Sequence, residues 1–359
     1  MMALKAACKL GTHRVLEPAA SLPQTAWKLD NTPVARENEI LCDVDALNID
    51  SASFRQIAEA CDGDETRVAA HVLALVAERG KHHNPVTGSG GMFLGRIREI
   101  GAALVTAHDA RPGDRIASLV SLTLTPLRIE AIERIDMATG RIWIRGTAIL
   151  FATAAYAKLP DDVPPDVALA VLDVAGAPAQ VRRLASPGAT VAILGADGKS
   201  GLLSCVQARE RVGPHGRVVG IGPDATTAGA RLLVACGYVD AFVQADARDT
   251  LAILEAVPTA LPTLADLTIN CVNVPGTELS SILITRDHGT VYFFSMSTSF
   301  TAAALGAEGV GKDVTMIVGN GYAKGHAAIA LQTLRDHPAL RAYFVDRYGH
   351  VPPAAALPV

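Results

Sequence analysis

A glycine-rich segment near the middle of the chain has the residue types of a phosphate-binding turn. It runs from Gly195 to Gly201, reads G-A-D-G-K-S-G, follows the apolar run 189–194 and precedes a helical pattern. Glycine lets a ligand approach the backbone closely, and the N–H groups at the start of a helix attract negative charge. The residues that we expect to contact the phosphates are Gly195, Gly198, Lys199, Ser200 and Gly201.

The spacing of these glycines distinguishes two classes of nucleotide-binding protein. A P-loop requires a glycine five residues before its Gly-Lys-Ser sequence, and that position is Ile193 here. It also requires an acidic residue at the end of a neighbouring strand to hold magnesium, whereas the apolar run 267–272 continues into Asn273. The spacing of Gly195, Gly198 and Gly201 is instead a variant of the dinucleotide-binding fingerprint.

The chain from about residue 160 onward alternates between strand and helix patterns. This alternation predicts a doubly wound parallel sheet, the fold that places a glycine turn against a dinucleotide. The expected strands are 189–194, 217–221, 241–243, 267–272 and 290–294, and the expected helices are 202–211, 228–236, 250–256 and 278–285.

The chain before about residue 150 has the short apolar runs of a mainly β domain. One helix is expected at 65–79, where Val68, Val72 and Val76 recur on one face and Gly80 provides the stop. The two domains together make an α/β protein. The expected strands of the first are 39–45, 93–100, 115–120, 130–135 and 141–145, the last two joined as a hairpin.

The composition excludes several classes of protein. A formal net charge of −4 over 359 residues gives no electrostatic reason to expect nucleic acid or an anionic membrane as a partner. The apolar runs are shorter than the roughly 20 residues that span a bilayer, and no signal-peptide pattern is seen, so we expect a cytoplasmic protein. The six cysteines are widely spaced, which predicts free thiols and neither disulfides nor structural zinc.

Several segments resemble a known superfamily. The segments 110–116, A-R-P-G-D-R-I, and 186–191, S-P-G-A-T-V, are similar to motifs of the medium-chain dehydrogenases and reductases. Longer segments resemble, more narrowly, the family of L-erythro-3,5-diaminohexanoate dehydrogenases. These are 84–92, 122–127, 293–300 and 318–326.

The resemblance implies both an architecture and a reaction. It implies a GroES-like, β-rich catalytic domain at 1–157, completed by 319–359, and a Rossmann dinucleotide-binding domain at 158–318. The implied reaction is NAD(P)-dependent oxidative deamination of L-erythro-3,5-diaminohexanoate, a diamino acid, to 5-amino-3-oxohexanoate and ammonia in lysine fermentation. The resemblance also implies a homodimer or larger homo-oligomer. Two other functions stay open: another zinc-free reductase of the superfamily, acting on a quinone or an enoyl thioester, and a catalytically silent nucleotide sensor.

The chain departs from the zinc-dependent members of the superfamily at two places. Where those proteins have a cysteine and a Gly-His-Glu sequence, this chain reads Asn48-Ile49-Asp50-Ser51 and, at 87–91, T-G-S-G-G. Neither segment supplies a thiolate or an imidazole at the matching position, and carboxylate alone is a poor set of zinc ligands. We therefore expect catalysis without a metal ion.

Four further residues are considered around the cofactor, which is NAD or NADP. An acidic residue about 20 positions after the glycine turn normally accepts the ribose hydroxyls, but Gly222 occupies that place and Asp224 comes slightly late. Arg231 is the residue that could reach the 2′-phosphate of NADP. Asn273 and Ser295 follow the fourth and fifth strands, at the sheet edge where ligands of open α/β sheets bind.

Three residues are candidates for catalysis, because removal of hydride from a carbon that bears an ammonium group first needs a base to take a proton. Asp50 stands in the place of the absent zinc cysteine. Asp173 interrupts an apolar run, where a charge is costly unless it is paired; the alternative is a helix-capping or salt-bridged aspartate. His83 belongs to the cluster 81–84, K-H-H-N, whose alternative is a solvated group at a helix C-terminus.

Overall fold

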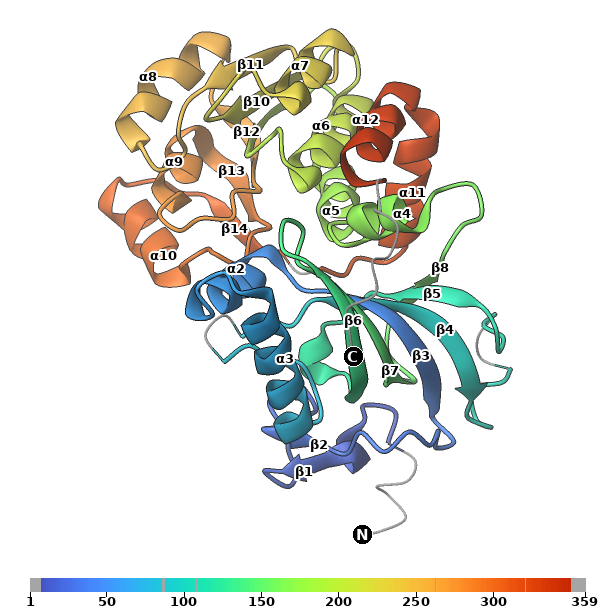
Figure 1. Ribbon diagram of the computed structural model, residues 1–359. Helices are drawn as coiled ribbons and strands as arrows, with labels where there is room; N and C mark the ends of the chain where they lie inside the picture. The colour runs from blue at the N-terminus through green and yellow to red at the C-terminus, as the bar shows by residue number, and fades with distance from the viewer. Residues whose placement is uncertain (1–7, 86–87, 107–108, 262, 320, 350–359) are drawn as a thin grey trace. The chain divides into compact units, whose positions relative to one another are not determined.

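The chain forms two compact units in the computed structural model, which describes residues 8–85, 88–106, 109–261, 263–319 and 321–349 (Figure 1). The first unit contains the described residues up to Pro165, and the second contains those from Asp166 onward. Thr87 and Asn320, which fall in segments quoted above, lie outside the described residues.

The first unit is built on a six-stranded antiparallel sheet. Its strands lie in the order β6-β7-β3-β4-β5-β8, and a separate antiparallel pair, β1 and β2, precedes them in the chain. All five predicted strands are confirmed, most of them longer than expected, and β8 is additional. The bounds are β1 Val15–Glu17, β2 Lys28–Leu29, β3 Glu39–Asn48, β4 Met92–Ile100, β5 Arg115–Ser118, β6 Leu127–Asp136, β7 Arg141–Phe151 and β8 Tyr156–Lys158.

Two α-helices of the first unit follow β3. The expected helix is confirmed as α3 (Glu65–Arg79): the Asp64 carboxylate caps its first turn, and Gly80 ends it in the left-handed conformation at φ 67°. Helix α2 (Ser51–Ala60) was not expected. Two short 3-10 helices, Thr12–Arg14 and Leu122–Leu124, complete the unit.

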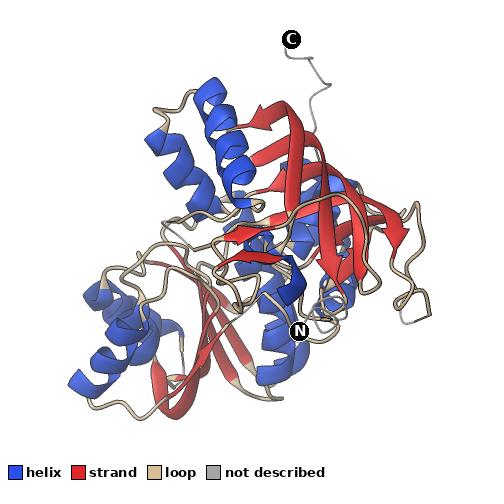
Figure 2. Ribbon diagram, turned by 90° about the horizontal axis from the view of Figure 1, so that it is seen from below, coloured by secondary structure: helices blue, strands red, loops and turns tan. Residues whose placement is uncertain are grey.

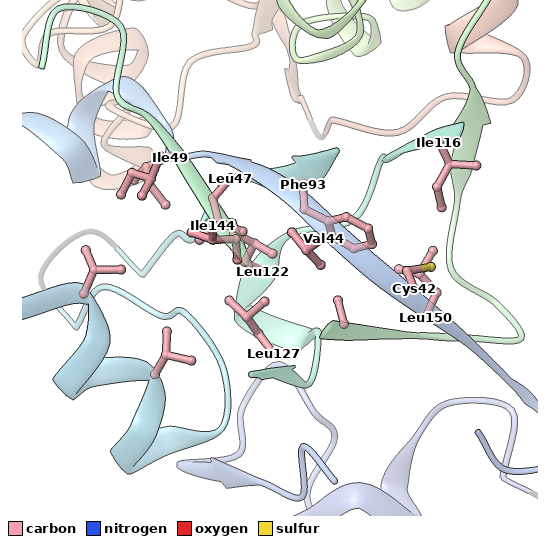
Figure 3. Packing of buried hydrophobic residues seen from close by; sticks show 14 of the residues in the cluster. Cys42, Val44, Leu47, Ile49, Phe93, Ile116, Leu122, Leu127, Ile144 and Leu150 are labelled. Atoms are coloured by element: carbon pink, nitrogen blue, oxygen red, sulfur yellow. The ribbon is translucent and has the colours of Figure 1, made fainter. Parts of the chain in front are cut away.

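The core of the first unit lies between the sheet and α3. Figure 3 shows side chains of β3, β4 and β7, among them Val44, Phe93 and Ile144, converging with Leu122 and Leu127 on one cluster. Cys42 is part of it, and burial raises the pKa of its thiol to about 12, so it stays uncharged. The free thiol that the sequence predicted here is a core residue.

The second unit is a parallel sheet of six strands in the order β11-β10-β9-β12-β13-β14. The strand order reverses between β9 and β12, and ligands of open α/β sheets bind at the carboxyl ends of strands at such a point. The five predicted strands are confirmed, and β14 is additional. The bounds are β9 Thr190–Leu194, β10 Arg217–Gly222, β11 Ala241–Gln244, β12 Ala265–Asn270, β13 Thr285–Phe293 and β14 Thr315–Val318.

Helices lie on both sides of this sheet (Figure 2). In Figure 1, α5, α6, α11 and α12 lie on one side and α8, α9 and α10 on the other. No described helix is long and apolar enough to cross a membrane. The bounds are α4 Pro165–Leu172, α5 Gly176–Leu184, α6 Lys199–Val212, α7 Ala228–Ala235, α8 Thr250–Ala260, α9 Glu278–Leu283, α10 Phe300–Gly309, α11 His326–Asp336 and α12 Pro338–Tyr348.

The last two helices correct the expected domain division. We expected the return segment 319–359 to complete the first domain, but α11 packs against α5 and α6, and α12 packs against α7. Two side-chain contacts hold them there: Gln207 Nε2 donates to Thr333 Oγ1 at 2.9 Å, and His337 Nε2 lies 2.9 Å from Glu210 Oε1. The described part of the return segment therefore belongs to the second unit.

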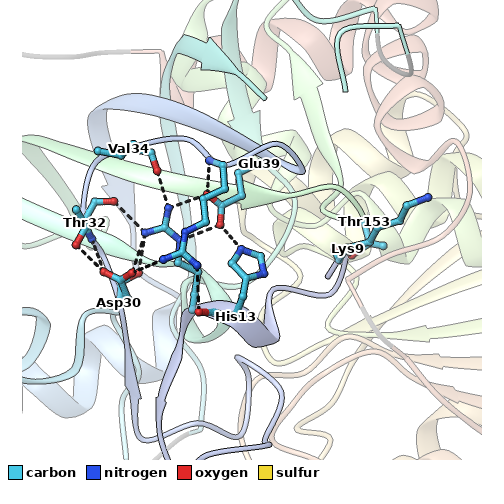
Figure 4. Close-up of polar contacts among 9 residues, drawn as sticks. Lys9, His13, Asp30, Thr32, Val34, Glu39 and Thr153 are labelled. Carbon is cyan, nitrogen blue, oxygen red and sulfur yellow. Dashed lines mark hydrogen bonds and ion pairs between the residues drawn. The ribbon is translucent and has the colours of Figure 1, made fainter. Parts of the chain in front are cut away.

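A buried carboxylate ties the N-terminal segment to the sheet of the first unit. Glu39, at the start of β3, is fully buried and lies beside His13 (Figure 4), and it also accepts hydrogen bonds from the Arg14 side chain and the Arg36 backbone N–H. Arg14 donates from Nε to Oε1 at 2.8 Å and from Nη2 to Oε2 at 2.7 Å, and His13 Nε2 lies 2.6 Å from Oε1. Burial alone would raise the pKa of Glu39, but the hydrogen bonds from Arg14 and His13 outweigh it and lower that pKa to about 2.

Replacement of this carboxylate should destabilise the protein in a pH-dependent way. Glu39→Gln should lower the free energy of unfolding by up to about 3–5 kcal/mol, because it removes the nearer, fully buried counter-charge of the Arg14 guanidinium and leaves the partly exposed Asp30, whose Oδ2 lies 3.3 Å from Nη1. The pKa of Glu39 is lower in the folded protein than the usual value of 4.5, so the ionised carboxylate stabilises the fold fully above pH 4.5. This stabilisation is lost as the pH falls toward 2 and the carboxyl takes up a proton. The difference between wild type and variant should therefore shrink over that range in urea unfolding experiments.

The exposed ion pair of Asp43 and Arg98 provides the control. Asp43→Asn should change the free energy of unfolding by less than about 1 kcal/mol, because both charges stay solvated. A Glu39→Gln effect as small as this, or one that does not vary between pH 4.5 and pH 2, would contradict the assignment.

Candidate functional site

The predicted phosphate-binding turn lies at the carboxyl end of β9, the central strand beside the reversal of strand order. Gly195 takes the left-handed conformation at φ 71°, which favours glycine, and its N–H donates to the Ile221 carbonyl of β10 at 2.9 Å. Gly198 is the N-cap of α6, and Leu202 N–H donates to its carbonyl at 2.8 Å. The turn therefore passes directly from strand to helix, as the sequence predicted.

Gly201 sets how closely α6 approaches this turn. A Cβ on Gly201 would lie 2.1 Å from the Gly195 carbonyl oxygen, so only glycine fits at this position. The first N–H groups of α6 are those of Lys199, Ser200 and Gly201, and they lie at the positive end of the helix dipole. Close backbone packing and a helix N-terminus are the two features that a pyrophosphate needs. The residues present fit a dinucleotide.

The Lys199 side chain pairs with one of the predicted catalytic residues. Its Nζ lies 2.7 Å from Asp173 Oδ2, and the two side chains are 26% and 21% exposed. Asp173 directly follows α4, so the ion pair links that helix to the first residue of α6. The structure thus gives Asp173 the salt-bridged role that the sequence left as its alternative, beside the glycine turn.

Polar residues follow β12 and β13 at the same edge of the sheet. Asn270 is fully buried at the end of β12, where its Nδ2 donates to Thr277 and Ser281 and its Oδ1 accepts from Val272 N–H at 3.0 Å. This network holds the loop that carries Asn273, whose side chain is exposed. Ser295 is half-buried after β13, and its Oγ accepts from Ser297 N–H at 3.2 Å. Asn273 follows β12, the strand next to β9 in the sheet, and Ser295 follows β13, the strand beyond it.

Asp224 is the predicted ribose-binding carboxylate. It is exposed after β10, and its Oδ1 accepts from the N–H and the hydroxyl of Thr226 at 2.7 and 2.6 Å. These hydrogen bonds from Thr226 lower the pKa of Asp224. The carboxylate therefore stabilises a local turn.

The other predicted catalytic residues, Asp50 and His83, lie in the first unit. Asp50 caps α2, with Oδ1 accepting from Ser53 N–H at 3.0 Å, while Oδ2 is buried without a hydrogen-bond partner among the described residues. His83 is half-buried and its Nδ1 likewise lacks a partner within the described part of the chain. Burial and the charges of Lys81 and Arg79 lower the pKa of His83 to about 4.

His82, which sequence reasoning did not select from the 81–84 cluster, has the more defined geometry. It is fully buried, and its Nδ1 lies 3.1 Å from the Gly90 carbonyl oxygen. Since a carbonyl only accepts, Nδ1 carries the hydrogen and Nε2 keeps its lone pair in the neutral ring. Burial lowers the pKa of His82 to about 4, an effect partly offset by the charge of Asp50. Its Nε2 has no hydrogen-bond partner in the described residues.

Within the described residues, no three His, Cys, Asp or Glu side chains are grouped so as to hold a metal ion. At the position of the absent zinc cysteine, Asp50 uses one oxygen as a helix cap. The donor set at this position is therefore a single carboxylate oxygen, which alone is a poor zinc site.

Comparison with known proteins agrees with this geometry. Residues 13–160 match the family model of the L-erythro-3,5-diaminohexanoate dehydrogenase N-terminal domain. The chain is 55% identical over 342 residues to an L-erythro-3,5-diaminohexanoate dehydrogenase of Acetoanaerobium sticklandii, which covers 95% of this chain and 99% of that protein. It is 53% identical over 346 residues to the enzyme of the same name from Fusobacterium nucleatum, and this match covers 96% of this chain and 100% of that protein.

Solved structures with the same fold are far more distant in sequence. The quinone oxidoreductase of Coxiella burnetii superposes with a TM-score of 0.51 at 15% identity, covering 89% of this chain and 90% of that one. The CurK enoyl reductase superposes with a TM-score of 0.50 at 14% identity, and the match covers 88% of this chain and 79% of that one. These likenesses confirm the predicted fold class, a Rossmann sheet with a GroES-like β domain.

The contact at Gly201 can be tested directly. Gly201→Ala should weaken NADH binding by tenfold or more and destabilise the protein by about 1–3 kcal/mol, because the added methyl group pushes α6 away from the turn. Fluorescence titration with NADH and thermal unfolding measure the two effects.

Gly309→Ala is the matched control, because a Cβ at this helical glycine would meet nothing within 4 Å. It should bind NADH as the wild type does and be more stable by up to about 1 kcal/mol. Normal NADH binding by Gly201→Ala would show that the turn does not hold the nucleotide.

Proposed function

This chain belongs to the L-erythro-3,5-diaminohexanoate dehydrogenase family, and from that membership we propose that it oxidatively deaminates L-erythro-3,5-diaminohexanoate with NAD(P)⁺. The products are 5-amino-3-oxohexanoate, ammonium, NAD(P)H and one proton, with one water consumed. The observation that carries the proposal is the 55% identity to an enzyme of that name across nearly the whole of both chains. The cofactor accepts the hydride from C3 when bound.

The second unit supplies the cofactor site of the proposal. The N–H groups of Lys199, Ser200 and Gly201 bind the pyrophosphate at the start of α6, and Gly195 and Gly198 give it room. Asn273 and Ser295, after β12 and β13, hydrogen-bond the nicotinamide ribose and ring. The ion pair of Asp173 with Lys199 makes Asp173 a positioning residue, since it fixes the end of α6 that receives the phosphates.

The first unit supplies the proton chemistry. Hydride can leave C3 only after the C3 ammonium has lost a proton, and water must then add to the resulting imine. The lone pair of His82 Nε2 and the free oxygen of Asp50 are buried acceptors suited to hold an ammonium group and to take its proton. His83, also neutral, is the second candidate base.

A homodimer or larger homo-oligomer stays a prediction. Strand β14 is the terminal strand of the parallel sheet, and exposed apolar side chains occur on and before it, at Met296, Phe300 and Val318. A terminal strand edge flanked by apolar side chains favours pairing with a second copy of the chain.

The substrate assignment has a simple test. The purified enzyme should form reduced cofactor from L-erythro-3,5-diaminohexanoate, and the activity should survive exhaustive chelation because the proposal assigns no zinc. Quinones and enoyl thioesters should not oxidise NADPH with this protein. Turnover of either compound without turnover of the diamino acid would replace the proposal with a reductase function.

The proton-transfer residues are tested by substitution. Asp50→Asn and His82→Gln should each lower kcat about 100-fold or more, the size expected for loss of a general base, with NADH binding unchanged. Asp173→Asn should weaken NADH binding, because it removes the counter-charge of Lys199.

Asp64→Asn is the matched control for Asp50→Asn. Asp64 caps α3 as Asp50 caps α2, with Oδ1 accepting from Arg67 N–H at 2.9 Å, but it is exposed, whereas Oδ2 of Asp50 is buried. It should keep normal turnover. Near-wild-type turnover in the Asp50, His83 and Asp173 variants alike would reject this set of site residues.

A further inference from the structure

The end of β10 lacks the acidic residue that usually selects the cofactor. Gly222 occupies that position, and a Cβ built there would lie 2.9 Å from Oδ1 of Asp197. The Asp197 carboxylate, which comes from the middle of the glycine turn, therefore fills the space that a side chain at position 222 would take. A carboxylate is therefore present at the end of β10, and it is supplied by the glycine turn that follows β9.

Thr227 holds this carboxylate in place. Its Oγ1 accepts from Ala230 N–H at 3.1 Å as the N-cap of α7, and donates its hydrogen to Asp197 Oδ2 at 3.0 Å. Because the cap uses the hydroxyl as an acceptor, its single hydrogen is free for the carboxylate. Asp197 is half-buried, and among the described residues no hydrogen bond to its Oδ1 is formed.

The glycines around Asp197 leave room beside it. A Cβ on Gly229 would lie 2.8 Å from the Asp197 backbone oxygen and 3.3 Å from the Tyr343 hydroxyl, and one on Gly222 would touch both Asp197 and Phe242. A larger residue at position 222 would displace the carboxylate, and one at position 229 would press on the Asp197 backbone. The small residues and the threonine hydroxyl together orient one oxygen of Asp197 toward the end of β10.

We propose that Asp197 accepts hydrogen bonds from the adenosine ribose of the cofactor and makes the enzyme prefer NAD to NADP. The inference rests on the proposed function, which requires a nicotinamide nucleotide at the glycine turn. A free carboxylate oxygen accepts the 2′-hydroxyl of NAD, whereas the 2′-phosphate of NADP would meet a like charge.

The other candidates around this position are less suited. Asp224 is exposed and uses Oδ1 in its turn with Thr226. Arg231, the residue that could favour NADP, is exposed and donates to the Thr226 backbone carbonyl. Asp197 is the half-buried carboxylate whose free oxygen lies at the end of β10.

The test measures equilibrium binding without substrate, by fluorescence titration of NADH and NADPH. Wild type should bind NADH at least tenfold more tightly than NADPH. Asp197→Asn keeps an acceptor for Thr227 and should weaken NADH binding and strengthen NADPH binding, changing the ratio of the two dissociation constants by tenfold or more. An unchanged melting temperature shows that the variant is folded.

Asp224→Asn is the competing variant, since it removes the other carboxylate near the end of β10. A larger change in the NADH to NADPH ratio for Asp224→Asn than for Asp197→Asn would overturn the inference. So would a wild-type preference for NADPH, or a ratio that Asp197→Asn leaves unchanged while NADH still binds. Binding of neither nucleotide by wild type would overturn the proposed function itself, and with it this inference.

Discussion

The approach of Gly201 to the Gly195 carbonyl is the contact on which the nucleotide-binding unit depends. Because a Cβ at Gly201 would lie 2.1 Å from that oxygen, α6 can begin directly against the end of β9 only with glycine at this position. This fixes Gly198 as the helix cap and brings Lys199 within 2.7 Å of Asp173. It also turns Asp197 toward Thr227. One backbone contact thus determines where the N–H donors and two charged side chains of the turn lie.

Two clusters of polar groups carry the proposed site, one in each unit, and these two clusters differ in how their groups are paired. In the second unit, Asn270 is buried with its amide nitrogen and oxygen both hydrogen-bonded, and Lys199 is paired with Asp173. In the first unit, Asp50 Oδ2 and His82 Nε2 are buried with no hydrogen-bond partner among the described residues. An unpartnered buried polar atom costs free energy, so its retention is better explained by binding than by stability. We therefore propose that Asp50 and His82 transfer protons and that the ion-paired groups at the start of α6 position the cofactor.

Local signals in the sequence predicted the local parts of the structure. Helix 65–79 was predicted residue for residue because Asp64 and Gly80 mark both ends, and the glycine turn was recognised from its spacing together with the strand and helix patterns around it. Helix α2 was missed because its few apolar positions, such as Phe54 and Ile57, give a weak pattern. Helices α11 and α12 were assigned to the wrong domain because their partners on α5, α6 and α7 lie more than a hundred residues away in the chain. The pairing of Asp197 with Thr227, and of His82 with Gly90, likewise depends on contacts that spacing does not encode.

If the enzyme removes an amino group by oxidation, ammonia and reduced cofactor must form in a fixed ratio, and that ratio is the decisive measurement. Ammonia and reduced cofactor should be measured together during complete conversion of L-erythro-3,5-diaminohexanoate. Ammonia and reduced cofactor should form in equal amounts, and the amount of each should equal the amount of substrate consumed. Reduced cofactor without ammonia, or no reduced cofactor from this diamino acid, would contradict it.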